Sequence, residues 1–189
     1  MKVVKFNENV FINCPFDVQY KQFFNAIVFA IFDCGFVARC ALEEDDGSQI
    51  RVNKIYDIIA QCRLGIHDLS RVEVSKSAKL PRFNMPLELG AFLGAKHFGQ
   101  GVQKTKSCLI LDSEAFRYQK FISDISGQDI KAHSNNTRRI ITLVRDWLRT
   151  YTSVSIPSGS VIWFRYKLFK KDLPFLCEEL KLNCKGTHI

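Results

Sequence analysis

Residues 10–42, VFINCPFDVQYKQFFNAIVFAIFDCGFVARCAL, contain the pattern that decides the fold. A short apolar run at 10–14 is followed by Pro15 and then by a longer stretch with apolar residues at helical spacing. Asp17 stands where a helix-capping residue is expected, and Gly35 stands where a helix would end. A second apolar run follows at 36–42. This order predicts two parallel strands joined by a helix.

The rest of the chain continues this alternation without a repeat or a linker. Apolar runs typical of strands occur at 64–69, 107–112 and 129–132, and helices are predicted at 48–63, 86–97, 114–125, 137–150 and 161–182. Pro86 suits the first turn of its helix because proline lacks the N–H that a first turn leaves unpaired. We therefore predict one α/β domain over residues 1–189, doubly wound and flavodoxin-like. Its parallel sheet should have about five strands in the order 2-1-3-4-5, with helices on both faces.

Composition excludes several classes of protein. The chain has 189 residues, of which 47% are hydrophobic and 24% charged, values typical of a folded globular protein. No apolar run approaches the roughly 18 residues that a membrane span needs, and the first residues lack the features of a signal peptide. Seven cysteines form no C-x-x-C pair, so we expect reduced thiols and no metal site. These features predict a cytoplasmic protein that does not enter membranes.

The net charge of +8 lies mostly in the C-terminal part of the chain. The basic residues there are Arg138, Arg139, Arg145, Arg149, Arg165, Lys167, Lys170 and Lys171. They alternate with apolar residues at helical spacing, which favours the solvated faces of amphipathic helices over a nucleic-acid-binding surface. Nucleic acid is therefore not an expected partner.

Polar residues gather where the predicted strands end. Open parallel sheets bind ligands beyond the carboxyl ends of their strands. The first strand is followed by residues 13–17, the third by residues 68–71, and the helix after it begins near Asn84. Because these ends meet at one edge of the sheet, we expect a nucleotide-type pocket there.

Glu88 is the strongest catalytic candidate at this edge. Its neighbours in the helix are apolar, and it lies near the helix N-terminus, whose dipole favours an ionised carboxylate. A carboxylate in a partly dry pocket can attack, or electrostatically stabilise, an electron-poor sugar carbon. The alternative is that Glu88 only caps its helix or pairs with Arg82.

Asp68 ends an apolar strand, where a charge must be paired or must face a cavity. It could orient a sugar hydroxyl or hold an arginine such as Arg71. His67 should point to the opposite face of the sheet, because side chains alternate along a strand. We therefore interpret His67 as a packed core residue and not as a catalytic base.

Several well-known reaction types lack their motif in this chain. There is no G-x-G-x-x-G, no G-x-x-x-x-G-K-[ST], no H-E-x-x-H and no G-x-S-x-G. Cleavage of a glycosyl bond by one or two carboxylates remains, because it requires neither a phosphate-binding loop nor a cofactor. We expect no cofactor and no metal.

Three segments resemble one known family. These are FINCPFD at 11–17, GIHDLSR at 65–71 and FNMPLELGAFLGA at 83–95. Together they resemble the nucleoside 2-deoxyribosyltransferase-like branch of the TIR-related superfamily over about residues 9–180. The most specific element is the E-L-G-x-x-x-G-A start of the helix. Two segments depart from the family pattern: residues 82–85 replace a Gly-Thr segment, and the first loop is not of the Gly-Pro type.

The resemblance implies cleavage of an N-glycosidic bond in a nucleotide, a nucleoside or NAD, with antiphage effectors among the relatives. It gives Glu88 the position of the nucleophile and Asp68 that of the acid that contacts the sugar. The predicted substrate-binding residues are Asn13, Cys14, Pro15, Phe16, Arg39, Ser70, Arg71, Asn84 and Met85. Arg39 or Arg71 could neutralise a phosphate. The alternative is a non-catalytic nucleotide sensor that acts through a partner effector protein. A homo-oligomer is expected in either case.

Overall fold

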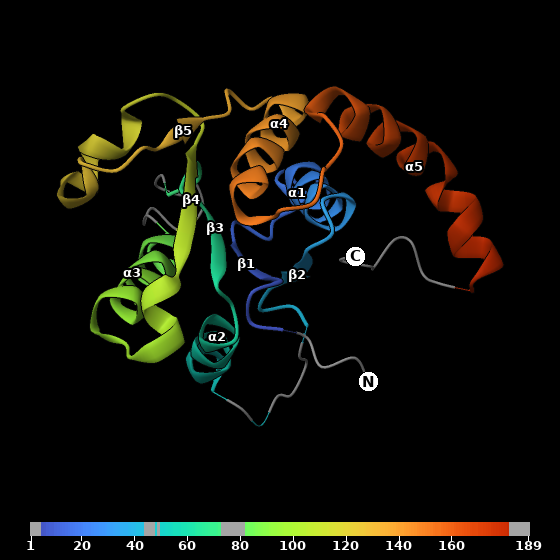
Figure 1. Cartoon of the computed structure of the whole chain (residues 1–189). Coiled ribbons are helices and arrows are strands. Elements are labelled where there is room, and N and C mark those ends of the chain that lie inside the picture. Colours follow the sequence, from blue (N-terminus) through green and yellow to red (C-terminus); the bar gives the residue numbers. More distant parts are fainter. Residues whose placement is uncertain (1–4, 44–47, 49, 73–81, 182–189) are drawn as a thin grey trace.

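The structure is a computed structural model that describes residues 5–43, 48, 50–72 and 82–181. Its centre is a five-stranded sheet in the order β2-β1-β3-β4-β5, in which every neighbouring pair is parallel (Figure 1). The strands are β1 (Asn9–Asn13), β2 (Val37–Arg39), β3 (Leu64–Asp68), β4 (Ser107–Asp112) and β5 (Lys131–Ala132). The predicted α/β fold and its strand order are confirmed.

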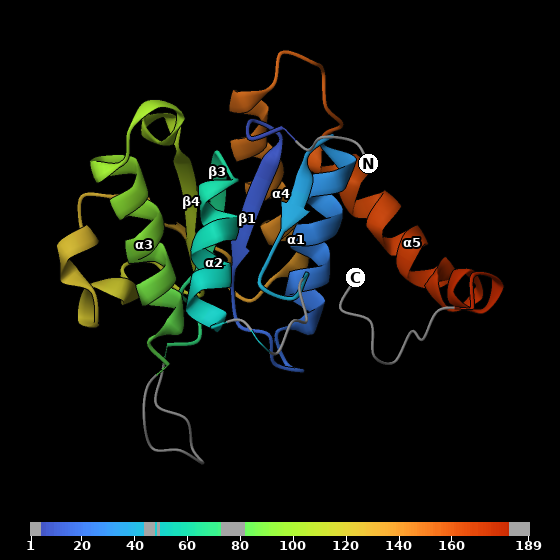
Figure 2. The same ribbon diagram turned by 90° about the horizontal axis from the view of Figure 1, so that it is seen from below.

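Helices cover both faces of this sheet, as expected for a doubly wound fold. On one face lie α1 (Lys21–Asp33) and α4 (Thr137–Leu148), and α5 (Gly159–Glu179) packs outside them. The opposite face is covered by α2 (Arg51–Ala60) and α3 (Asn84–Phe98) (Figures 1 and 2). Short 3-10 turns complete the fold: η1 (Gly101–Thr105), η2 (Arg117–Lys120), η3 (Ser123–Ile125) and η4 (Arg149–Tyr151). In both views α5 extends away from the sheet.

The alternation of side chains along the central strands divides the core between the two faces. Val10 and Ile12 of β1 join the cluster that α1 and α4 bury, whereas Phe11 packs with α2 and with Phe92 of α3. The same alternation places Ile66 of β3 on the α1 face. Because β1 and β3 are buried over their whole length, their carboxyl ends are held rigidly relative to one another.

Two predicted helices differ from the observed elements for local reasons. The first helix begins at Lys21 because Asp17 instead forms a turn, in which its carboxylate accepts a hydrogen bond from Tyr20 N at 3.0 Å. The segment predicted as a helix at 114–125 forms only the 3-10 turns η2 and η3. There Arg117 is held against the sheet by hydrogen bonds to Asp112 and to the Leu69 carbonyl.

The cysteines largely follow expectation. Cys14, Cys34, Cys40, Cys62 and Cys108 carry free thiols. Cys177 is disulfide-bonded, which corrects the expectation that every cysteine is reduced. Among the described residues, no helix is both long and apolar enough to cross a membrane.

Candidate functional site

Asn13, the last residue of β1, joins the carboxyl end of the sheet to the start of α3. Its Nδ2 donates a hydrogen bond to the Met85 carbonyl at 2.8 Å and lies 3.0 Å from His67 Nδ1. An amide nitrogen only donates, so His67 Nδ1 accepts and its Nε2 carries the hydrogen. Burial and the nearby Lys106 lower the pKa of His67 to about 3, which keeps its ring neutral. His67 therefore serves the packing of this region, as its alternation with Asp68 indicated.

Glu88 lies one turn further along α3, half-buried. Burial raises its pKa to about 7, and the positive charge of Arg51 at the start of α2 only partly opposes this shift. The helix dipole, on which the sequence interpretation relied, favours the ionised form, whereas loss of solvation raises the pKa. At neutral pH Glu88 is divided between its protonated and ionised forms, which is the condition that suits proton transfer or a poised nucleophile.

The thiol of Cys14 is within electrostatic range of several acidic residues at this edge. The thiol is buried, and its pKa is raised well above the ordinary value, first by burial and then by the charges of Asp68, Glu88 and Asp17. These carboxylates come from β3, α3 and the turn after β1. The fold thus brings Asp68 and Glu88, the two predicted catalytic residues, within electrostatic reach of one thiol.

Asp68 itself points to the other face of the sheet, towards α1. Its carboxylate is fully buried and accepts hydrogen bonds from the Tyr20 hydroxyl and from Ser70 N, the latter at 2.8 Å. His133 Nε2 lies 3.2 Å from Asp68 Oδ2, within ion-pair distance but without the geometry of a regular hydrogen bond. Burial alone would raise the pKa of Asp68, but His133, Ser70 and Tyr20 together lower it. Asp68 is therefore ionised and closed off from solvent.

The proton position on His133 follows from its other ring nitrogen. Asn135 N donates to His133 Nδ1 at 3.0 Å, so in the neutral ring the hydrogen lies on Nε2, which faces Asp68. The sequence contained little signal for His133, because it follows a strand of only two residues.

Two arginines at the rim share one carboxylate. Arg71 and Arg82 approach Asp17 Oδ2 at 3.3 and 2.8 Å, and their side chains are 37% and 46% exposed. In the structure Arg82 thus pairs with Asp17 instead of Glu88, and Arg71 pairs with Asp17 instead of Asp68. Because two guanidinium groups face a single carboxylate, the rim keeps a net positive charge that an anionic group could neutralise.

The other predicted substrate-binding residues have different surroundings. Phe16 is half-buried and packs edge-on against Phe24 of α1, with ring centroids 5.4 Å apart. Arg39 pairs with Glu43 at 2.6 Å and donates to Gln61 Oε1 at 3.3 Å, beside the carboxyl end of α2. These contacts hold the Arg39 side chain against Glu43 and the end of α2. Pro15 is buried, and Asn84 is exposed at the first position of α3.

Asp112 is a site residue that the sequence interpretation missed. It ends β4 as Asp68 ends β3, so the same pattern of an acid after an apolar strand could have identified it. Its Oδ1 accepts from Ser113 N at 2.6 Å and from Arg117 Nε at 2.8 Å, while the buried Oδ2 makes no hydrogen bond. Burial raises the pKa of Asp112 against the opposing Arg117, and the charge of Asp68 raises it further.

This edge of the sheet therefore combines three features. Glu88 has a pKa near neutral pH, Asp68 is a buried anion, and Arg71 and Arg82 give the rim a positive charge. No group of three or more His, Cys, Asp or Glu side chains that could hold a metal ion occurs in the described ranges. Comparison of the chain with models of protein families, with curated proteins and with solved structures finds no match.

Proposed function

We propose that the protein cleaves the N-glycosidic bond of a nucleotide, a nucleoside or NAD, by hydrolysis or by transfer to another base. The observation that carries this proposal is Glu88, a half-buried carboxylate whose pKa is raised to about 7 at the start of α3. It lies near the edge where parallel sheets bind ligands, within electrostatic range of Cys14 in the first loop. The resemblance to nucleoside 2-deoxyribosyltransferase-like proteins supports the same role for this glutamate.

In this reaction the ionised carboxylate of Glu88 attacks the anomeric carbon of the sugar. The carbon–nitrogen bond breaks, and its electron pair leaves with the base, which then takes up a proton. Water, or the nitrogen of another base, next attacks the anomeric carbon and releases Glu88. Because the site is partly dry, the negative charge of Glu88 stabilises the developing positive charge more strongly than it would in water.

The surrounding residues have distinct parts in this proposal. Arg71 and Arg82 are exposed enough to bind a phosphate, which favours a nucleotide over a free nucleoside. Asn84 at the start of α3 is suited to a sugar hydroxyl, and the exposed part of Phe16 to the base. We assign Asp68 a positioning role, because Tyr20 and His133 close it off while it fixes the backbone at Ser70.

Replacing Glu88 with Gln tests the mechanism. This change keeps the shape of the side chain and removes the ionisable oxygen, so base release should fall by about 10²–10³-fold or more. Binding of the intact nucleotide should change much less, because its anomeric carbon carries little charge in the ground state. The measurement is chromatography of free base after incubation with a panel of nucleotides, nucleosides and NAD.

Glu178→Gln provides the matched control, because Glu178 is an exposed residue of α5 far along the chain from the site. This variant should retain the wild-type rate. If Glu88→Gln releases base as fast as the wild type, the mechanism is wrong.

A non-catalytic nucleotide sensor that acts through a partner effector is the second candidate function. It is favoured by the exposed arginines of the rim, which could bind a phosphate without any chemistry at Glu88. Binding of a nucleotide by the wild type, with no base released across the whole panel, would identify the sensor. An antiphage role fits either reading: the enzyme would deplete a nucleotide pool, and the sensor would report on one.

A further inference from the structure

The outer edge of β4 is covered over only part of its length. Ser107 N donates to the Arg63 carbonyl, and Leu69 N donates to the Leu111 carbonyl, so the backbone groups of residues 107, 109 and 111 face β3. Because backbone groups alternate in direction along a strand, the N–H and C=O groups of Cys108 and Ile110 face the edge of β4 that lies away from β3. There β5 pairs only with Leu111 and Asp112. In the part of the chain that the structure describes, no strand lies beside Cys108.

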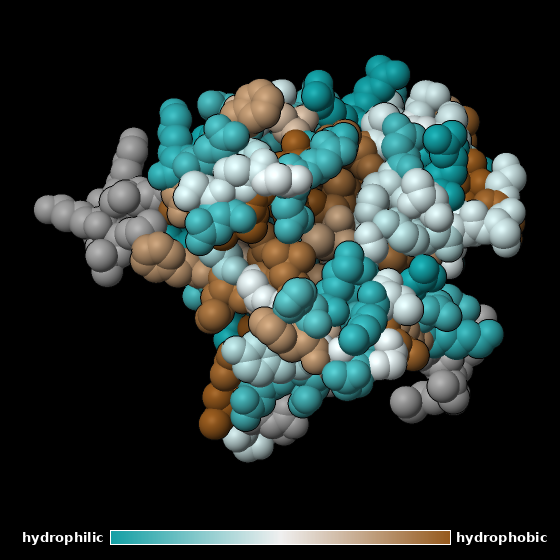
Figure 3. All heavy atoms as spheres, turned by 60° about the vertical axis from the view of Figure 1, so that its left-hand side comes forward, coloured by the Kyte–Doolittle hydropathy of each residue, from teal (hydrophilic) through white to brown (hydrophobic). Residues whose placement is uncertain are grey.

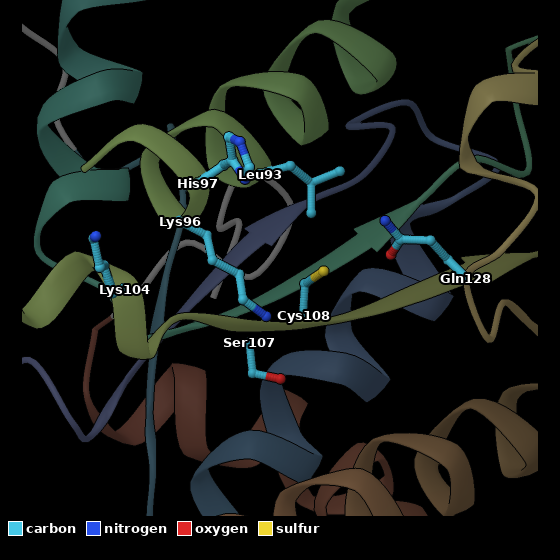
Figure 4. A pocket seen from close by; sticks show the side chains of 7 residues that line it. All are labelled: Leu93, Lys96, His97, Lys104, Ser107, Cys108 and Gln128. Atoms are coloured by element: carbon cyan, nitrogen blue, oxygen red, sulfur yellow. The ribbon is translucent and has the colours of Figure 1, made fainter. Parts of the chain in front are cut away.

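A groove of about 580 Å³ runs along this uncovered part of β4. Its volume falls within the range of about 300–1,000 Å³ that is usual for ligand pockets. It is lined by Leu93, Lys96, His97, Lys104, Ser107, Cys108 and Gln128 (Figure 4). On this side of the molecule, hydrophobic residues lie in a hollow that hydrophilic residues surround (Figure 3). Leu93 and Cys108 are the apolar residues among those that line the groove, and the groove lies beside the open edge of β4.

The charged residues that line the groove are all basic or titratable to a cation. Lys96 and His97 come from the last turn of α3, and Lys104 comes from η1. In Figure 4 the Lys96 side chain reaches from α3 towards β4 beside Cys108, while Lys104 and Gln128 lie at opposite ends of the groove. No lining residue is acidic. A ligand with negative charge would therefore be complementary to the groove.

We propose that this groove binds an extended, acidic segment of a partner protein, which pairs with β4 as an additional strand. The backbone N–H and C=O of Cys108, which have no strand partner on this edge among the described residues, would bond the backbone of the segment, as in other cases in which a peptide extends a sheet. Side chains on one face of the segment would meet Lys96 and Lys104, and alternation places acidic residues at every second position. A small anion alone would leave the open strand edge unused.

This inference is independent of the proposed N-glycosidic activity, because the groove lies along the amino-terminal half of β4 and Glu88 lies beyond the carboxyl ends of the strands. Loss of segment binding would leave base release unchanged. Failure of one proposal can thus be told from failure of the other.

The test uses blocked fluorescent peptides of about seven residues, the length of an ordinary strand. One alternates valine with glutamate, and its counterpart alternates valine with lysine. By fluorescence anisotropy with the full chain, the glutamate peptide should bind at least about tenfold more tightly than the lysine peptide. If the glutamate peptide does not bind at millimolar protein, or if both bind equally, the proposal is wrong.

Backbone pairing is tested by methylating the peptide nitrogens. One derivative of the glutamate peptide is methylated at every valine nitrogen and the other at every glutamate nitrogen, which blocks opposite edges of the strand. One derivative should lose about tenfold or more in affinity, and the other should bind as before, because only one edge pairs with β4. Equal affinities for the two derivatives would show that no strand is added.

The charge requirement is tested with Lys96→Glu combined with Lys104→Glu. Both lysines are exposed, so the fold should be kept, and the glutamate peptide should bind at least about tenfold more weakly. Lys170→Glu combined with Lys171→Glu is the matched control, since it makes the same charge change on exposed positions of α5. An equal loss of affinity for the glutamate peptide in the control would show that the groove is not the binding site. So would a dimer of the protein that the peptide dissociates, because a second copy would then occupy the groove.

Discussion

Gly65, in the middle of β3, leaves room for two rings that pack on the α3 face of the sheet. A Cβ atom at this position would lie 2.8 Å from His67 Nε2 and 2.8 Å from a ring carbon of Phe92. Both rings are fully buried, and their centroids are 5.0 Å apart. Neither can move without disturbing the packing of β3 against α3.

Gly65→Ala should therefore destabilise the protein by about 1–3 kcal/mol, the usual cost of overpacking a core. Urea unfolding measures the change. Gly90→Ala is the control, because a Cβ there meets no atom within 4 Å and the residue lies inside α3. It should stabilise the protein by up to about 1 kcal/mol, since alanine is the better helix former. Equal effects of the two changes would contradict the packing argument.

Glu88 links pH to stability as well as to chemistry. Burial raises its pKa from 4.5 to about 7 in the folded protein. The folded state thus holds the proton more tightly than the unfolded state, and this contribution is complete below the unfolded pKa. It is lost as the pH rises through about 7.

The free energy of unfolding of the wild type should therefore fall relative to that of Glu88→Gln between about pH 5 and pH 8. Urea unfolding of both proteins at the two pH values measures the difference, and the titrations that they share cancel. A constant difference across this range would mean that Glu88 is not buried in solution as the structure shows.

At the scale of elements, β1 connects the helices of one face through its two terminal residues. Asn9 Nδ2 donates to the Gln61 carbonyl at the end of α2, at 2.9 Å, and Asn13 Nδ2 donates to the Met85 carbonyl at the start of α3. Phe11 lies between them in the core. Because odd-numbered residues of the strand share this face, one strand positions both helices.

Asn13→Leu should free the start of α3 and cost about 1–3 kcal/mol, because the Met85 carbonyl and His67 lose a buried partner. Hydrogen exchange should quicken at the start of α3 and not at the end of α2. Asn9→Leu should show the reverse pattern, because it removes the bond to Gln61. Uniform acceleration over both helices in either variant would show that the two bonds do not act locally.

At the scale of the whole molecule, α5 carries an apolar row that no described part of the chain covers. Val161, Phe164, Leu168 and Phe175 lie on one side of this helix at helical spacing and are 42–71% exposed. The inner side is fixed by Ile162 and Tyr166, which are buried against the body of the protein. An exposed row of this kind on a helix is typical of an interface between proteins.

We predict that the protein forms a homo-oligomer through this row. Leu168→Glu should convert it to monomers, because a charge would then be buried in the contact, and analytical ultracentrifugation would show the lower mass. Val154→Glu is the control, since Val154 is 72% exposed in the loop before α5 and lies outside the row. A wild type that stays monomeric at micromolar concentration would contradict this prediction.

Several arginines of the basic C-terminal part form hydrogen bonds or ion pairs with other parts of the chain. Arg139 donates to the Ala132 carbonyl at 2.6 Å, Arg145 donates to the Pro157 carbonyl at 2.7 Å, and Arg165 pairs with Asp33 at 3.0 Å. These contacts give the three arginines roles within the fold, which the sequence interpretation of solvated helix faces did not include. A nucleic-acid partner is not part of the proposed function.

The local pattern of the chain was enough to predict a parallel sheet with helices on both faces, which the structure confirms. The alternation of strands and helices follows from local periodicity, whereas the strand order 2-1-3-4-5 is that of the flavodoxin-like fold which this alternation suggested. The local pattern also showed that Glu88 lies in an apolar helix start and that His67 and Asp68 face opposite ways. These properties depend on residues within one turn or on strand alternation.

The partner of each charged group, in contrast, depends on how distant elements pack together. Asp68 is held by Tyr20 and His133, and Asp17 by Arg71 and Arg82, although these residues lie far apart in the chain. The register of β3, β4 and β5 and the docking of α1 determine those pairs. The pKa of Glu88 was likewise decided by burial, because loss of solvation is a sum over surrounding elements that a local pattern does not contain.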